Sequence, residues 1–173
     1  MALTLYDASI PVYVQMLRNL AALLNKAEAH AEANGQPLSD LLEARLAPDM
    51  HTLIGQVQLA TDSAKGGAAR LAGLTPPSMP DTETTYEDLK TRVARTLAFV
   101  QAITPDQVSD DAERTIELPL PNRTMTFTAR DFVLTYSLPN FLFHVSMAYA
   151  LLRHKGAPIG KMDYLAGGRP PAA

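Results

Sequence analysis

The sequence predicts an all-α fold, a four-helix bundle with a small β-hairpin between the third and fourth helices. Apolar residues recur at spacings of three and four in four long segments, which is typical of amphipathic helices. One short segment instead alternates apolar and polar residues, as half-buried strands do. The 173 residues, 47% of them hydrophobic, suffice for one domain with a core of its own.

The first two predicted helices have recognisable ends. Ser9 is the expected N-cap of the first, which places Pro11 in its first turn and ends near Asn34-Gly35. Its apolar stripe consists of Ile10, Val14, Leu17, Leu20 and Leu24. Residues 39–46 favour a short connecting helix. Asp49 is the expected N-cap of the second long helix, which ends near Ala72.

In the second half of the chain, the spacing of the apolar residues changes from helical to alternating and back to helical. Thr84 and Glu87 have the spacing of a capping box at the start of the third helix. Residues 115–120 and 124–128 then alternate, which predicts the hairpin. Thr128 is the expected cap of the fourth helix, and Pro139 should kink that helix or separate its first turn.

Residues 1–165 are therefore expected to form a single helical domain, followed by a flexible tail at 166–173. The long connection between the second and third helices means that the helix order need not be a simple up-and-down one. The longest apolar run, residues 141–152, is too short to span a membrane, and the N-terminus lacks a leader pattern. With no cysteine and a net charge of −3, we expect a soluble cytoplasmic protein that binds neither nucleic acid nor membrane.

The most informative polar residues lie in the fourth helix. Asn140 and His144 are four residues apart in an apolar segment, so they share the helix face that meets a neighbour. Such a pair is either a ligand-binding spot or a hydrogen-bonded polar spot in a core. The other histidines, His30, His51 and His154, lie near helix ends.

Other chemistries lack a matching pattern. No serine has the surroundings of a nucleophile elbow, and no pair of carboxylates falls on a predicted inner face. Gly66-Gly67 lies inside a helix and not between a strand and a helix, so it does not predict a phosphate-binding loop. The small residues there instead favour close helix approach, inside the bundle or across a homodimer interface.

Short blocks distributed along the chain resemble a bacterial family of unknown function. They are Ala47-Pro48-Asp49-Met50, Gln56-Val57-Gln58, Ala64-Lys65-Gly66, Ala69-Arg70-Leu71-Ala72-Gly73, Asp81-Thr82-Glu83-Thr84-Thr85, the helix at 138–156 and Gly160-Lys161-Met162-Asp163-Tyr164-Leu165. That family is similar to the DinB-like (DinB/YfiT) superfamily of four-helix bundles, which includes metal-dependent thiol transferases that act on small molecules.

The resemblance also implies a metal site. DinB-like proteins typically hold a divalent metal with one histidine on the second helix and a His-x-x-x-His pair on the fourth. His144 matches the second histidine of that pair, whereas Asn140 replaces the first. Gln56 takes the place of the second-helix histidine, or His51 does in a shifted register. Zinc, nickel or iron would be the metal, although amide oxygens are weaker ligands than imidazoles.

Three functions follow from these features. The favoured one is a small-molecule binding or non-catalytic module in which Gln56, Asn140, His144 and Tyr149 line a pocket. The first alternative is a metal-dependent transferase or hydrolase with His144 completed by His51 or by Asp62. The second alternative is a structural bundle that forms a homodimer.

Overall fold

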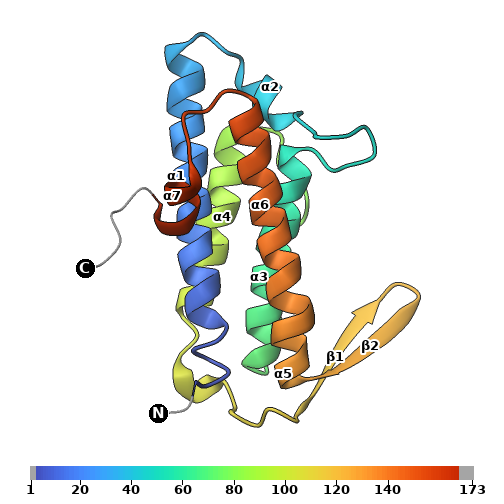
Figure 1. The fold of residues 1–173 in the computed structure, drawn as a ribbon. Helices are drawn as coiled ribbons and strands as arrows, with labels where there is room; N and C mark the ends of the chain where they lie inside the picture. The colour runs from blue at the N-terminus through green and yellow to red at the C-terminus, as the bar shows by residue number, and fades with distance from the viewer. Residues whose placement is uncertain (1–2, 168–173) are drawn as a thin grey trace.

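Four long helices lie side by side in the computed structural model, which describes residues 3–167 (Figure 1). They are α1 (Ile10–Ala33), α3 (Leu53–Leu71), α4 (Tyr86–Gln101) and α6 (Leu138–His154). Each presents an apolar stripe to the other helices, so burial of these stripes stabilises the bundle. The predicted fold class is confirmed.

The order of the helices around the bundle is α1, α4, α3, α6, with α1 and α3 on a diagonal. Helices α3 and α4 run in the same direction, because residues 72–85 return along the bundle before α4 begins (Figure 1). The long connection expected between them therefore produces an order that is not up-and-down. Helix α2 (Leu38–Leu42) lies in the connection between α1 and α3.

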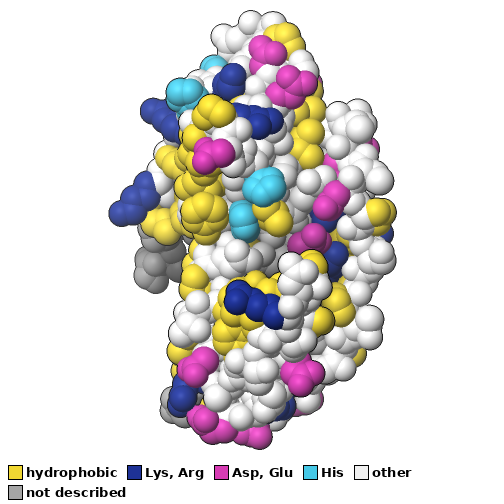
Figure 2. Space-filling model, turned by 90° about the vertical axis from the view of Figure 1, so that its right-hand side faces the viewer, with side chains coloured by type: hydrophobic (Ala, Val, Ile, Leu, Met, Phe, Trp, Pro, Cys, Tyr) yellow, Lys and Arg dark blue, Asp and Glu magenta, His cyan; other side chains and the backbone are white. Residues whose placement is uncertain are grey.

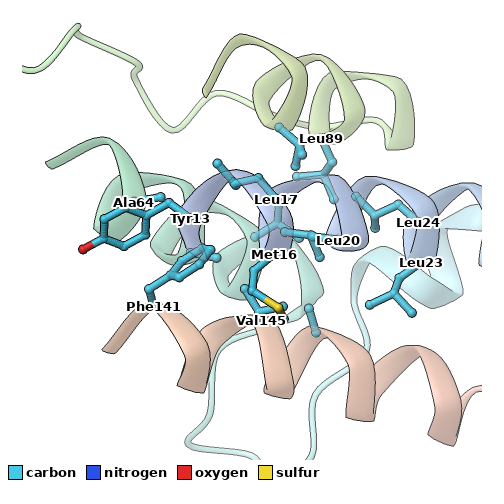
Figure 3. Close-up of a cluster of buried hydrophobic side chains, with 14 of the residues drawn as sticks. Tyr13, Met16, Leu17, Leu20, Leu23, Leu24, Ala64, Leu89, Phe141 and Val145 are labelled. Carbon is cyan, nitrogen blue, oxygen red and sulfur yellow. The ribbon is translucent and has the colours of Figure 1, made fainter. Parts of the chain in front are cut away.

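A cluster of buried apolar side chains lies where α1 meets α4 and α6 (Figure 3). Leu17 and Leu20 of α1 are fully buried, and Leu89 of α4 lies on one side of this row. On the other side the ring of Tyr13 meets Phe141 of α6 edge to face, with a centroid distance of 5.3 Å. The apolar stripe predicted for the first helix thus lies at the centre of the core.

The hairpin projects from one end of the bundle, after the short 3₁₀ turn η1 (Pro105–Gln107) (Figure 1). Strands β1 (Thr115–Leu120) and β2 (Arg123–Thr128) pair antiparallel, with Ile116 opposite Phe127. Ile116 and Leu118 are buried, whereas their neighbours on β1 are exposed. The predicted alternation is confirmed, because the apolar face of the hairpin lies against the helices.

Two helix starts differ from the prediction. The side chain of Thr52, not that of Asp49, caps α3 by accepting a hydrogen bond of 3.4 Å from the Gly55 amide. The capping box of α4 joins Thr85 to Asp88, one residue after the predicted pair. Two candidate capping residues lie within three positions of each other at both places, so composition alone does not select one.

Of two further predicted caps, at Ser9 and Thr128, only the second is formed by the side chain. Ser9 precedes α1 as expected, but its hydroxyl donates to the Leu5 carbonyl at 2.6 Å and makes no cap bond. Thr128 does cap the fourth helical segment, accepting from the Asp131 amide at 3.1 Å.

The helical segment after the hairpin is continuous but unevenly wound. It consists of α5 (Ala129–Asp131), the π-helical turns η2 (Phe132–Ser137) and α6, in which Pro139 lies in the first turn. Proline has no amide hydrogen to donate to the preceding turn, so the winding widens there. The expected irregularity at Pro139 therefore takes the form of a π-helix.

A short last helix, α7 (Lys161–Ala166), folds back onto α1 and was not predicted. Asn19 of α1 donates to the Tyr164 carbonyl at 2.9 Å, and Lys26 forms an ion pair with Asp163. The expected flexible tail at 166–173 begins inside α7, and its residues 168–173 lie outside the described part of the chain. No helix among residues 3–167 is both long and apolar enough to cross a bilayer.

Candidate functional site

Gln56 of α3 and His144 of α6 are joined inside the bundle. The Gln56 side-chain carbonyl oxygen lies 2.8 Å from His144 Nδ1, and the two residues are only 2% and 9% exposed. A carbonyl oxygen can only accept a hydrogen bond, so Nδ1 donates and Nε2 keeps the lone pair. The structure therefore brings together, from two different helices, the two side chains that the resemblance assigned to one site.

His51 lies beside this pair at the entrance to α3. The Gln56 amide donates to the His51 carbonyl at 3.4 Å, and the His51 side chain lies over Gly55. Burial lowers the pKa of His144 below its ordinary value, and the neighbouring His51 lowers it further. Figure 2 shows histidine side chains gathered midway along the face of the molecule that lies at the right in Figure 1.

Asn140 also faces α3, one turn before His144, but it has a different partner. Its side-chain amide donates to the Ser63 hydroxyl at 2.7 Å, and Ser63 in turn donates to the Leu59 carbonyl at 2.7 Å. The seam between α3 and α6 thus carries two polar contacts, Gln56 with His144 and Ser63 with Asn140. Sequence reasoning missed Ser63, although it follows Gln56 by two helical turns and so shares its face.

Tyr149 is not part of this group in the structure. Its ring meets the ring of Tyr164 in α7, with centroids 5.8 Å apart and an interplanar angle of 71°. Tyr149 follows His144 by five residues, which turns it about 140° around the helix. The structure therefore brings together Gln56 and His144, places Asn140 one turn away, and puts Tyr149 on another side of α6.

A cleft opens next to Asn140, between α3, η2, the start of α6 and strand β1. Its volume is about 420 Å³. The polar part of its lining consists of Asp62, Ser63, Arg70, Tyr136, Ser137 and Asn140. Arg70, Tyr136 and Ser137 were not singled out from the sequence, since only the π-helical winding and the position of the hairpin bring them to one place.

Glycines shape the floor of this cleft. A Cβ atom on Gly67 would come within 2.6 Å of the Tyr13 hydroxyl and would also clash with the Ser137 hydroxyl. A Cβ on Gly66 would lie 2.8 Å from an Arg70 nitrogen. The small residues predicted to permit close approach therefore do so inside the bundle, between α3, α1 and η2.

The comparisons with known proteins agree with this architecture. The model of a family described as "Domain of unknown function (DUF1993)" matches residues 5–165. The chain belongs to the DUF1993 family. A comparison with proteins of curated function gives no match for this DUF1993 chain.

Among solved structures, the DUF1993 chain is similar to a DinB family member protein from Shewanella denitrificans, whose crystal structure was determined at 1.83 Å resolution. The two sequences are 39% identical, the match covers 98% of this chain and 94% of the other, and the TM-score is 0.88. The resemblance to DinB-like bundles stated from short sequence blocks is thereby confirmed.

The residues of the DUF1993 chain do not fit the three-histidine metal centre typical of that superfamily. Gln56 turns its carbonyl oxygen to His144, and Asn140 directs its amide nitrogen to Ser63. Asp62, considered as a replacement ligand, is bound by Lys65 at 2.8 Å and by Arg92 at 2.9 Å. Within residues 3–167, no three histidine or carboxylate side chains are grouped so that they could hold an ion.

Proposed function

We propose that this protein is a DinB-like module that binds a small molecule in the cleft beside Asn140 without catalysing a metal-dependent reaction. The observation that carries the proposal is the cleft itself. Its volume of about 420 Å³ falls in the range of small-molecule sites, and few polar groups converge on it. In this proposal Asn140 contacts the ligand directly.

Gln56 and His144 support the cleft without lining it, since His144 lies one helical turn after Asn140. Their hydrogen bond pairs His144 Nδ1 with the side-chain oxygen of Gln56, two buried polar atoms that come from the two long helices bordering the cleft. A satisfied polar contact of this kind fixes the register of α3 against α6. We therefore assign the pair to holding the walls of the cleft, with Ser63 and Asn140 exposed to the ligand.

The proposal can be tested by NMR titration with three fragments, benzamide, phenol and benzoate. We expect at least one of them to shift the backbone amides of Ser63, Gly66 and Asn140 at concentrations up to about 10 mM. The variant Asn140→Leu should lose most of that response and keep a dispersed spectrum. No shift at these amides with any of the three fragments would contradict the proposal.

One observation favours the alternative of a metal-dependent transferase or hydrolase. Because His144 donates through Nδ1, its Nε2 lone pair is free, and His51 lies close enough to affect its pKa. In this alternative the two imidazoles hold zinc, nickel or iron, with water or substrate completing the coordination.

Metal titration separates the two functions. If the alternative holds, the metal-free protein binds about one Zn²⁺, Ni²⁺ or Fe²⁺ per chain, and His144→Ala and His51→Ala each lose it. His154→Ala is the matched control, since that residue lies at the far end of α6 and is exposed. If the wild-type protein binds none of these ions, the metal-dependent alternative is wrong.

The homodimer and the cytoplasmic location stay predictions. The small residues of α3 considered for a dimer interface are used inside the bundle, because Gly67 and Ala68 are buried within a single chain. A homodimer would therefore use another surface. Light scattering at micromolar concentration measures whether one forms.

A further inference from the structure

Arg70 is the unusual residue of the cleft. It lies in the last turn of α3, half-buried, and its guanidinium donates to the Gly66 carbonyl at 3.0 Å. Among the described residues, no carboxylate lies within 4.0 Å of it, whereas the more deeply buried Arg92 has three such partners. Within residues 3–167, most of the donors of the Arg70 guanidinium thus have no protein acceptor.

The local charge of the cleft is positive for a second reason. Asp62 is the only acidic residue in its lining, and the Asp62 carboxylate is already held by Lys65 and Arg92. Its negative charge is therefore compensated from outside the cleft. Burial lowers the pKa of Arg70, but a guanidinium remains charged at neutral pH.

The remaining lining contributes both polar groups and apolar surface. Asn140 presents its side-chain amide next to Ser63. The rings of Phe132 and Tyr136, which also line the cleft, stack with centroids 6.1 Å apart. Two leucines of the hairpin, Leu118 and Leu120, add further apolar lining. A ligand that fits this surface has a compact apolar body and an anionic end.

We propose that the cleft binds a small organic carboxylate, with Arg70 engaging the carboxylate through its guanidinium fork and Asn140 supplying a further polar contact. This inference rests on the proposed function, because it names the class of ligand for the same cleft. The planar guanidinium matches a carboxylate with two parallel hydrogen bonds, an arrangement that a lysine cannot reproduce. Phe132, Tyr136 and the hairpin leucines cover the apolar body.

The orientation of the Arg70 side chain is set by Gly66, one turn earlier in α3. A side chain on Gly66 would occupy the space through which the arginine folds back toward the cleft. The hydrogen bond to the Gly66 carbonyl uses one guanidinium nitrogen, which holds the group in place before a ligand arrives. Such preorganisation reduces the entropy lost on binding.

The experiment compares benzoate with benzamide, which have the same ring and differ mainly in charge. Titrations of the backbone amides of Ser63, Gly66 and Asn140 are run at constant ionic strength. We expect benzoate to bind at least about tenfold more tightly than benzamide. Arg70→Gln should abolish that preference, and Arg70→Lys should reduce it, because lysine keeps the charge and loses the fork.

Arg95→Gln is the matched control, since it removes the same charge from an exposed position on α4 outside the cleft. It should leave the preference unchanged, and a loss equal to that in Arg70→Gln would overturn the inference. Equal binding of benzoate and benzamide would also overturn it while leaving the proposed function intact. Binding of neither fragment, nor of phenol, would contradict both.

Discussion

Tyr13 of α1 and Ser137 of η2 share a hydrogen bond of 2.6 Å that passes directly over the Cα atom of Gly67 in α3. Three helical segments therefore meet at one point with no space for a side chain. Burial raises the pKa of Tyr13 to about 12, although the bond to Ser137 opposes the shift. The phenol thus stays neutral near pH 7 and remains available as a hydrogen-bond partner.

We predict that Gly67→Ala lowers the free energy of unfolding by about 1–3 kcal/mol, because the added methyl group clashes with both hydroxyl oxygens. The matched control is Gly66→Ala, whose methyl group meets only the flexible end of Arg70. In that variant the gain in helix propensity, about 1 kcal/mol, should largely offset the contact. Urea denaturation measures both, and equal stability of the two variants would contradict the prediction.

The second prediction concerns how the contact between Gln56 and His144 contributes to stability. Gln56→Leu leaves the His144 Nδ1 donor buried without a partner, which should cost about 1–3 kcal/mol. His144→Leu leaves the Gln56 carbonyl in the same situation. The double variant should be less destabilised than the sum of the two, with a coupling of about 0.5–3 kcal/mol. Strict additivity in urea denaturation would show that the two side chains do not depend on each other.

The features that could be predicted from the sequence are those set by local periodicity. The stripe containing Leu17 and Leu20 and the alternation around Ile116 follow from which residues share a face, whereas the pairing of Gln56 with His144 came from the resemblance to DinB-like proteins. Residues four apart on α6 and seven apart on α3 remain on one face. The second polar contact, Ser63 with Asn140, was accessible to the same reasoning.

The features that could not be predicted depend on distant segments. The cleft exists because the hairpin and the π-helical η2 are placed against the end of α3, and no local pattern encodes that placement. From the sequence, Arg70 is an ordinary residue of a helix C-terminus, and only the structure shows that its guanidinium bonds to the Gly66 carbonyl and has no carboxylate partner within residues 3–167. Helix α7 was missed because its six residues have no apolar stripe, and contacts with α1 hold it.

The depressed pKa of His144 predicts how stability depends on pH. Burial, assisted by His51, makes protonation harder in the folded state than in the unfolded chain. As the pH falls below about 6.5, the unfolded state takes up the proton first, so stability is complete above that value and decreases below it. Urea midpoints measured between about pH 7.5 and about pH 5.5 should fall more for the wild type than for His144→Gln.

The comparison between the two proteins removes the contribution of the other histidines, which both contain. His154→Gln serves as a second control, because that exposed side chain at the end of α6 has no buried partner. It should show the same decrease as the wild type. An identical decrease in His144→Gln would mean that His144 is not kept neutral by its surroundings.

Arg92 provides the last prediction, since its side chain is 2% exposed and joins α3, α4 and the segment between them. It pairs with Glu83 at 3.0 Å and with the more exposed Asp62 and Asp81 at 2.9 Å each. Its Nε also donates to Thr61 at 2.8 Å. This one cation therefore holds residues 80–83 against α3 and α4.

We expect Arg92→Leu to cost about 3 kcal/mol, because it leaves Glu83 as an almost buried, uncompensated carboxylate. Burial alone would raise the pKa of Glu83, but the hydrogen bonds from Gln58 and Arg92 outweigh it and lower that pKa. Asp81→Asn should cost less than about 1 kcal/mol, since Asp81 is 58% exposed and remains solvated.

Adding Glu83→Gln to Arg92→Leu should recover part of the loss, because the stranded carboxylate is then neutral. The three variants are compared by urea denaturation near neutral pH, where Glu83 is ionised in the wild type. A double variant as unstable as, or less stable than, Arg92→Leu would show that the cost comes from lost packing of the arginine side chain. In that case the ion pair with Glu83 would not be what holds residues 80–83 against the bundle.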